Sequence, residues 1–117
     1  MTEALYPRPS KALAQRRSAL APKIDAAFQQ FSQAVFQDGA LPRKSKQLIA
    51  VAVAHVTQCP YCIQGHTKAS VREGATPEEI MEAIWVAAEM RAGGTFAHSA
   101  LALDALDAAG PHGKVTA

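Results

Sequence analysis

The segment LIAVAVAHV, residues 48–56, has no face polar enough to meet water comfortably. Its β-branched residues also suit a buried strand, but Ala50, Ala52 and Ala54 and the helical patterns on both sides favour a helix. We therefore expect a helix that begins near Pro42 and is buried on nearly all sides. Other helices must pack around it, so the expected fold class is all-α.

A second helical pattern precedes this segment. Its larger apolar residues recur at steps of three or four, or at sums of these steps, and therefore lie along one stripe of a helix. Pro22 suits a first helical turn and Gly39 suits a helix end, so we expect the main helix to run from about Pro22 to Asp38. Residues 1–19 are expected to form an N-terminal arm. The apolar stripe comprises Leu13, Leu20, Ile24, Phe28, Phe31 and Val35.

A third helix is expected to open at Cys59-Pro60 and to run to about Glu73, where Gly74 closes it. With Pro60 at the first helical position, Cys59 becomes the N-terminal cap and Cys62 lies in the first turn. A helix N-terminus presents unpaired N–H groups and a partial positive charge, which both favour a thiolate over a thiol.

The clearest helix start in the chain lies in TPEEIMEAIWVAAEM, where Thr76 is the cap, Pro77 takes the first helical position and Glu79 completes a capping box. This helix is expected to end at the Gly93-Gly94 pair, and a fifth helix is expected over about Thr95–Ala109. The expected buried stripe comprises Ile80, Ile84, Ala87 and Ala88. The fifth helix carries Leu101, Leu103 and Leu106.

The composition indicates one helical domain that associates with copies of itself. Hydrophobic residues make up 49% of the chain and charged residues 19%, as in folded globular proteins. Aromatic residues make up only 6%, so the core is lean and we expect apolar surface to be shared between subunits. The domain of about five helices is expected to span residues 20–109, with residues 110–117 as a flexible tail.

Charge and hydropathy exclude several classes of function. Twelve basic and ten acidic residues give a net charge of +2 and are scattered in short groups, which gives little support to nucleic-acid binding. No stretch approaches the roughly 20 apolar residues of a membrane span, and the N-terminus lacks the apolar run of a secretory signal. We therefore expect a cytoplasmic protein without a membrane partner.

The two cysteines of the chain lie in CPYCIQGH, residues 59–66. Their spacing in a first helical turn lets the two sulfurs approach closely enough for a reversible disulfide, in which one thiol attacks and the other resolves. His66 lies four residues after Cys62 on the same helical face, where it can accept the thiol proton or stabilise the thiolate. We expect Cys62 to be held ionised and within bonding reach of Cys59.

Two other interpretations of the cysteine pair remain open. Structural zinc needs four ligands, and here His66, with His55 or His98 in reserve, would have to complete the set. Alternatively, both cysteines are inert core residues. In a reducing compartment a static disulfide over two intervening residues would stabilise little, which favours the redox pair.

The remaining histidines and the tryptophan have structural interpretations. His55 lies in a strongly apolar helix and is expected to be a hydrogen-bonded core or interface residue, as is His98. His112 lies in the tail and has no expected role. Trp85 follows the apolar pattern of its helix, so packing in the core or between subunits is expected.

The pattern Cys59-x-x-Cys62-x-x-x-His66, preceded by LPRKSKQLIAVAVAH and followed by TPEEIMEAIWVAAEM, resembles the AhpD-like alkylhydroperoxidase branch of the carboxymuconolactone decarboxylase family. The resemblance covers roughly residues 20–109. It implies an all-helical protein that assembles into trimers or hexamers. It also implies that Cys62 attacks the peroxide and becomes a sulfenic acid, and that Cys59 then closes the disulfide.

The resemblance further places His66 in a proton relay, which in the family usually includes a glutamate twelve residues before the first cysteine. Here that position is Gln47, whose amide cannot accept a proton as a carboxylate does. The pair Pro60-Tyr61 stands where some members carry a histidine between the cysteines. Glu82 or Glu89 could substitute for the missing carboxylate.

The expected function is therefore a thiol-dependent alkyl hydroperoxide reductase of antioxidant defence, with Cys59, Cys62, His66 and Gln47 at its site. No metal or cofactor is expected. By analogy, the reductant is an external dithiol such as a lipoyl-bearing protein, and a peroxiredoxin is a further candidate partner. Two alternatives stay open: a decarboxylase acting on a muconolactone-type acid, and a non-enzymatic oligomer whose disulfide senses redox state.

Overall fold

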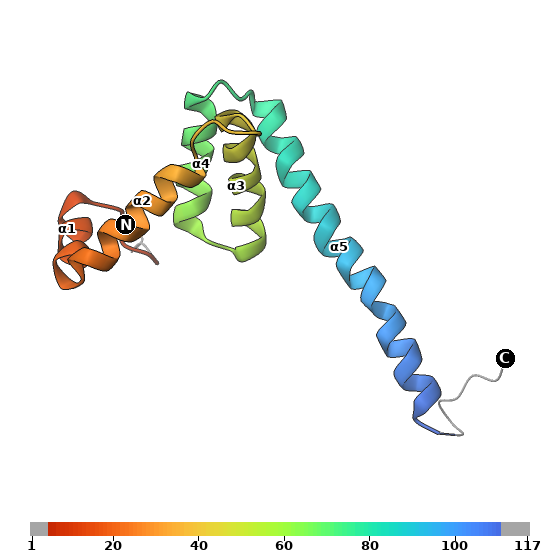
Figure 1. The fold of residues 1–117 in the computed structure, drawn as a ribbon. Helices are drawn as coiled ribbons and strands as arrows, with labels where there is room; N and C mark the ends of the chain where they lie inside the picture. The colour runs from red at the N-terminus through yellow and green to blue at the C-terminus, as the bar shows by residue number, and fades with distance from the viewer. Residues whose placement is uncertain (1–4, 111–117) are drawn as a thin grey trace.

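The computed structural model describes residues 5–110. The expected tail, apart from Gly110, and His112 lie outside the described residues. Within residues 5–110 all regular structure is helical and no strand is found, which confirms the all-α prediction (Figure 1). The helices are α1 (Lys11–Leu20), α2 (Pro22–Val35), α3 (Arg43–Thr57), α4 (Pro60–Arg72) and α5 (Pro77–Ala108).

Two helix starts follow local signals in the chain, as predicted. Cys59 is the N-terminal cap of α4 and Pro60 takes its first position. At the start of α5 the Thr76 hydroxyl accepts a hydrogen bond from the Glu79 N–H at 3.1 Å, and the Glu79 carboxylate accepts one from the Thr76 N–H at 2.9 Å. This reciprocal pair satisfies two N–H groups that the helix itself leaves free.

The packed part of the molecule is built on α3, which contacts both α4 and α5. Val51 is fully buried and forms the core with Ala75 and Ile80, while Leu48 and Ile84 pack against this cluster. An ion pair of 2.7 Å between Lys44 and Glu79 joins the starts of α3 and α5. Lys44 and Thr76 hold the pKa of the Glu79 carboxyl below its ordinary value. Of the expected buried stripe on α5, Ile80, Ile84 and Ala87 face inward, whereas Ala88 is exposed.

The predicted helix end at Gly93-Gly94 is wrong. These two residues lie inside α5, which continues unbroken to Ala108, so the predicted fifth helix over Thr95–Ala109 is the second half of α5. Glycine in a helix costs only about 1 kcal/mol relative to alanine, and a run rich in alanine and leucine on both sides offsets that cost. Neither glycine adopts a positive φ.

The predicted N-terminal arm, residues 1–19, contains a helix. Ser10 caps α1 by accepting a hydrogen bond from the Leu13 N–H at 3.2 Å, and α1 forms a hairpin with α2. The chain turns at Ala21, where extended φ of −153° breaks the helix before Pro22. The number of helices therefore equals the predicted five, but α1 takes the place of the separate fifth helix.

The end of α2 lies three residues earlier than the predicted Asp38. Two side chains account for this, one on α3 and one in the loop before it. Lys46 Nζ donates to the carbonyls of Val35 and Gln37 at 2.8 and 2.6 Å, so it caps the last turn of α2. The Asp38 carboxylate accepts a hydrogen bond from the Arg43 N–H at 2.8 Å and thereby caps α3 instead.

The single chain is far from compact. Its radius of gyration is 20.9 Å, whereas about 13 Å is typical for a compact domain of this length. It exposes 9590 Å² of surface, against about 6,100 Å² for a globular monomer of its mass. The α1–α2 hairpin and the second half of α5 extend from opposite sides of the packed part (Figure 1).

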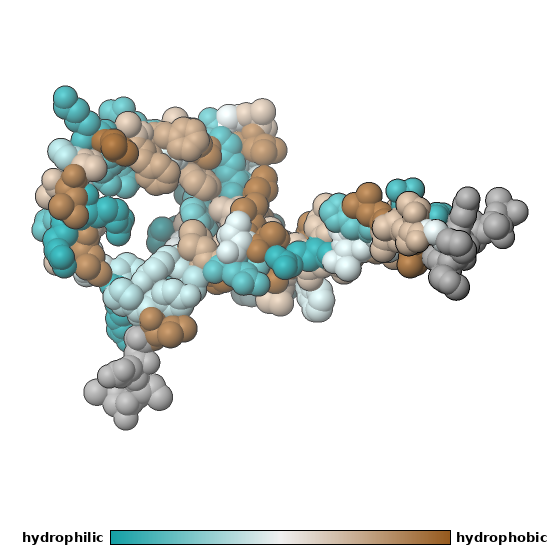
Figure 2. Space-filling model, turned by 90° about the horizontal axis from the view of Figure 1, so that it is seen from below, coloured by the Kyte–Doolittle hydropathy of each residue, from teal (hydrophilic) through white to brown (hydrophobic). Residues whose placement is uncertain are grey.

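The extended parts carry large apolar residues in contact with solvent. On α5 the ring of Trp85 is 67% exposed and that of Phe96 is 82% exposed. Hydrophobic residues lie along the arm of α5 with no other part of the chain beside them in this view (Figure 2). On α3 itself Ile49 and Val53 are about half exposed, so the predicted burial on nearly all sides is wrong for one chain alone.

Between residues 5 and 110 we find no helix that combines the length and the hydrophobicity of a membrane span.

Candidate active site

Both cysteines are free thiols, partly exposed, at the N-terminal end of α4. The sulfur of Cys59 accepts a hydrogen bond from the backbone N–H of Cys62 at 3.3 Å. Cys59 is therefore the hydrogen-bond acceptor of the pair, and its sulfur lies over the first turn of α4 that carries Cys62.

This arrangement sets opposite pKa shifts on the two thiols. The pKa of Cys59 lies below its ordinary value, because the Cys62 thiol and backbone N–H donate to its sulfur. The pKa of Cys62 lies above its ordinary value because its thiol donates to Cys59, because it is partly buried, and because Cys59 carries negative charge. The raised pKa of Cys62 runs against the expectation of an ionised Cys62, and Cys59 is the thiol of the pair that ionises more readily.

The helix dipole could not distinguish the two sulfurs, since both lie at the start of α4. The direction of the hydrogen bonds decides between them. Cys59 occupies the cap position, where free N–H groups of the first turn point at its side chain. Cys62 lies within the first turn, where its own backbone N–H lowers its pKa by less than the Cys59 contact and partial burial raise it.

His66 and Gln47 meet across the contact between α4 and α3. The side-chain oxygen Oε1 of Gln47 lies 2.7 Å from Nδ1 of His66. An amide oxygen can only accept, so Nδ1 carries the proton and the imidazole is held in the tautomer whose Nε2 has a free lone pair. Nε2 is then the nitrogen able to take a proton from a neighbouring group.

Phe36 fixes the plane of the imidazole. Its ring stacks on that of His66 with centroids 5.1 Å apart and an interplanar angle of 27°. Phe36 follows the last residue of α2 and lies 30 residues before His66, so no local pattern in the sequence indicated this contact. The stack and the hydrogen bond to Gln47 together restrict the imidazole to one orientation.

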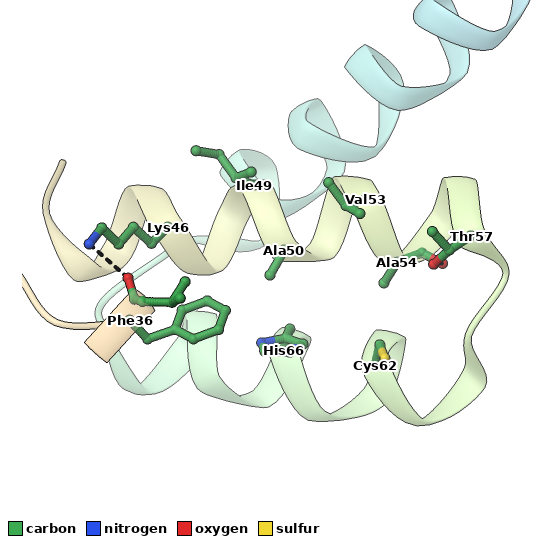
Figure 3. Close-up of a pocket in the computed structure, with 10 residues that line it drawn as sticks. Phe36, Lys46, Ile49, Ala50, Val53, Ala54, Thr57, Cys62 and His66 are labelled. Carbon is green, nitrogen blue, oxygen red and sulfur yellow. Dashed lines mark hydrogen bonds between the residues drawn. The ribbon is translucent and has the colours of Figure 1, made fainter. Parts of the chain in front are cut away.

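Cys62 and His66 face a pocket of about 370 Å³ between α3 and the end of α2 (Figure 3). Both side chains point from α4 toward α3. Apolar side chains form most of the wall. The residues of α2 and α3 in the wall are Val35, Phe36, Lys46, Ile49, Ala50, Val53, Ala54 and Thr57. Cys59 does not line this pocket, so a molecule that enters it meets the sulfur of Cys62.

A second, more polar groove borders on the same two residues. It occupies about 520 Å³ and again includes Phe36, Cys62 and His66. Here the wall contains polar side chains: Ser32, Gln33, Gln47, Tyr61 and Arg72. Cys62 and His66 therefore lie where an apolar pocket and a polar groove meet.

Tyr61, between the cysteines, contacts the N-terminal segment. Its hydroxyl donates to the carbonyl of Pro7 at 2.6 Å, and its ring meets that of Tyr6 edge to face at 5.9 Å between centroids. The Tyr61 hydroxyl therefore binds a backbone carbonyl 54 positions earlier in the chain.

The other candidates lie away from this site. His55 is half-buried and its Nδ1 lies 2.7 Å from the Val51 carbonyl, as expected of a hydrogen-bonded structural residue. His98 is exposed on the extended part of α5. Glu82 and Glu89 line neither the pocket nor the groove, so neither replaces the missing carboxylate within one chain. In residues 5–110 no group of three or more His, Cys, Asp and Glu side chains could hold a metal ion.

Known relatives share both sequence and fold with the chain. An uncharacterized protein encoded in the cox locus of Paracoccus denitrificans is 60% identical over 107 residues, which are 92% of this chain and 96% of that protein. An uncharacterized protein of Cupriavidus necator is 41% identical over 90 residues, covering 74% and 80% of the two chains.

Two solved structures are similar as well. A carboxymuconolactone decarboxylase family protein from Legionella pneumophila gives a TM-score of 0.62 at 40% identity, over 68% of this chain and 70% of that one. A protein from Methanobacterium thermoautotrophicum gives 0.67 at 31% identity, over 71% and 93%. The pattern of the carboxymuconolactone decarboxylase family matches residues 22–105. The chain belongs to the carboxymuconolactone decarboxylase family, in agreement with the AhpD-like resemblance of its motif.

Proposed function

We propose that the protein is a thiol-dependent hydroperoxide reductase in which Cys62 is oxidised and Cys59 closes the disulfide. The observation that carries the proposal is the shared pocket, which Cys62 and His66 face together. The Cys59 sulfur lies outside this pocket and accepts a hydrogen bond from the Cys62 backbone N–H. A nucleophile, a base and a second thiol are thereby within one helical turn of each other.

The first step needs a deprotonated Cys62. The pKa of Cys62 is raised, and Nε2 of His66 has the lone pair to take the thiol proton because Nδ1 donates its own proton to Gln47. The Cys62 thiolate then attacks the terminal oxygen of the hydroperoxide and the O–O bond breaks. The departing alkoxide takes the proton from His66 and leaves as an alcohol, and Cys62 is left as a sulfenic acid.

The second step suits the lowered pKa of Cys59. Cys59 loses its proton more readily than an ordinary thiol, and its thiolate attacks the sulfur of the sulfenic acid. The S–O bond breaks, and the hydroxide takes up a proton to leave as water. One hydroperoxide has then been reduced to alcohol and water, and two thiols have been oxidised to one disulfide. An external dithiol, of the lipoyl type by analogy with the family, restores both thiols by exchange.

Self-association is part of the proposal. Apolar residues of α2 and of the second half of α5 remain exposed in one chain, and the surface exceeds that of a compact monomer by more than half. Further copies of the same chain can cover these faces, because every copy offers the same two extended parts. The family resemblance implies a trimer or a hexamer.

Stopped-flow oxidation by an organic hydroperoxide tests the chemistry. The wild type is expected to lose two thiols in a single turnover, and Cys62→Ser is expected to lose none. Cys59→Ser should stop at a sulfenic acid that a trapping reagent captures on Cys62. Equal oxidation of Cys62→Ser and wild type would contradict the proposal.

Decarboxylation of a lactone acid, the reaction for which the family is named, needs no dithiol. Lactone turnover that survives replacement of both cysteines by serine would favour that reaction over peroxide reduction.

A further inference from the structure

The guanidinium of Arg72 has no role in the site described above. Arg72 lies in the last turn of α4, is exposed, and lines the polar groove that also contains Cys62 and His66. In the described part of the chain no ion pair or hydrogen bond engages its side chain. It is thus a free cation facing a groove that leads to the reactive sulfur.

The groove offers this cation no internal counter-charge. Other polar residues of its wall carry a hydroxyl and amides, Ser32, Gln33 and Gln47, and none of its lining residues is a carboxylate. A guanidinium with free N–H groups matches the two oxygens of a carboxylate in a planar, bidentate geometry. Hydroxyl and amide groups nearby can complete the hydrogen bonds of such a group.

The apolar pocket and the groove share Cys62 and His66, whereas Arg72 lines the groove and not the pocket. Cys62 and Arg72 are ten residues apart on one helix, which separates their backbones by about 15 Å along its axis. A substrate that occupies both the pocket and the groove therefore carries its peroxide group within a carbon chain. One end of this chain is anionic and lies several carbons away in the groove, and the other end is apolar and lies in the pocket.

We propose that Arg72 binds the carboxylate of the substrate, and that the preferred substrates are hydroperoxides of long-chain carboxylic acids. The inference rests on the proposed peroxide chemistry at Cys62 and adds a substrate class and a specificity residue to it. Arg72 touches the substrate end remote from the reacting oxygens, so it acts on binding and orientation.

The hydroperoxide of linoleic acid and its methyl ester form the test pair, since they differ in the carboxylate alone. The wild type is expected to have a KM for the acid about tenfold to hundredfold below that for the ester, as for a hydrogen bond to a charged group. Arg72→Gln should remove this difference by raising the KM for the acid, with the ester unchanged. Arg72→Lys should restore part of it, because a point charge replaces the planar donor.

Lys68→Gln is the matched control. It removes a cation one turn earlier on α4, from a residue that lines a different hollow beside the N-terminal segment. The preference for the acid is expected to survive in this variant. A preference that persists in Arg72→Gln, or that Lys68→Gln removes equally, would overturn the proposal, as would a wild type without any preference.

A binding measurement separates this inference from the peroxide chemistry. The corresponding hydroxy acid of linoleic acid cannot oxidise a thiol, and calorimetry should give it a dissociation constant about tenfold or more weaker with Arg72→Gln than with wild type. Equal affinities would sink the carboxylate site even if peroxide turnover is found. A weakened affinity would support the site even if no hydroperoxide is turned over.

Discussion

The packed part of the molecule and its extended parts differ in how far their apolar side chains are buried within one chain. In the packed part, α3, α4 and the first half of α5 bury Val51 and Ile80 and place Cys62 and His66 against one pocket. In the extended parts, α2 and the second half of α5 expose rings such as that of Phe96. The packed part can be understood from one chain, whereas the apolar faces of the extended parts have no covering partner in it.

The difference suggests a division of labour. Residues of the packed part should act on the rate of chemistry or on the stability of the chain. Residues of the extended parts should act on the size of the assembly. Substitutions in one part should therefore change the reaction rate or the stability, and substitutions in the other should change the native mass.

The largest effect is expected from Gln47→Glu, in the packed part. A carboxylate beside Nδ1 of His66 would complete a proton relay, and general acid or base assistance is typically worth about 10² to 10⁴ in rate. Peroxide turnover should rise about a hundredfold, without a change in native mass.

The control for this change is Gln64→Glu, which adds the same charge on α4 at a residue that lines the hollow beside the N-terminal segment. It should leave turnover near the wild-type value. If Gln47→Glu also leaves turnover unchanged, a redox sensor or another substrate would be favoured over a weakened reductase.

Val51→Ala should lower the free energy of unfolding by about 2 kcal/mol, because it removes two buried methyl groups and leaves a cavity in the core. Chemical denaturation of the assembled protein measures this loss. Val71→Ala makes the same change on α4 at a side chain that is 58% exposed, and is expected to alter stability by less than about 0.5 kcal/mol. Equal losses would show that the two residues do not differ in burial in the assembled protein.

Phe96→Asp, on the extended part of α5, should reduce the native mass. The wild type is expected to have a mass that is a multiple of 12.4 kDa. In the variant, association would bury a charged side chain without a partner, so the mass should fall toward that of the single chain. Light scattering measures the mass. Asp104→Asn on the same stretch is a control that should keep the assembly intact. A wild type of 12.4 kDa would contradict self-association.

The smallest effect concerns the resting thiolate. Cys62→Ala removes the thiol that donates to Cys59, the largest cause of its lowered pKa, so the pKa of Cys59 should rise toward its ordinary value. Alkylation of Cys59 by iodoacetamide reports the thiolate fraction, and its midpoint should move to higher pH in the variant. A midpoint that stays in place would mean that the helix N-terminus alone holds the thiolate.

The sequence was informative where structure depends on neighbours in the chain. The cap at Cys59, Pro60 in the next position and the Thr76–Glu79 box are all local, and each was predicted correctly. The family motif also indicated that Gln47 and His66 belong to one relay, and the structure brings them within hydrogen-bond distance.

Prediction failed at one weak local signal and gave nothing where distant residues determine the structure. Gly93 is a weak helix breaker whose cost the surrounding helix formers offset, so α5 continues through it. The stacking of Phe36 on His66 and the lining of the groove by Arg72 depend on where α2 lies beside α4. Which of the two thiols has the lowered pKa depends on the direction of a hydrogen bond that spacing alone does not fix.

The central claim is that Cys59 and Cys62 form one redox couple driven by a hydroperoxide. Mass spectrometry of the native protein after one equivalent of oxidant, with a thiol count, tests it most directly. The account predicts the loss of both thiols, a mass lower by two hydrogen atoms, and one alcohol per chain. Two intact thiols beside unconsumed hydroperoxide would contradict it.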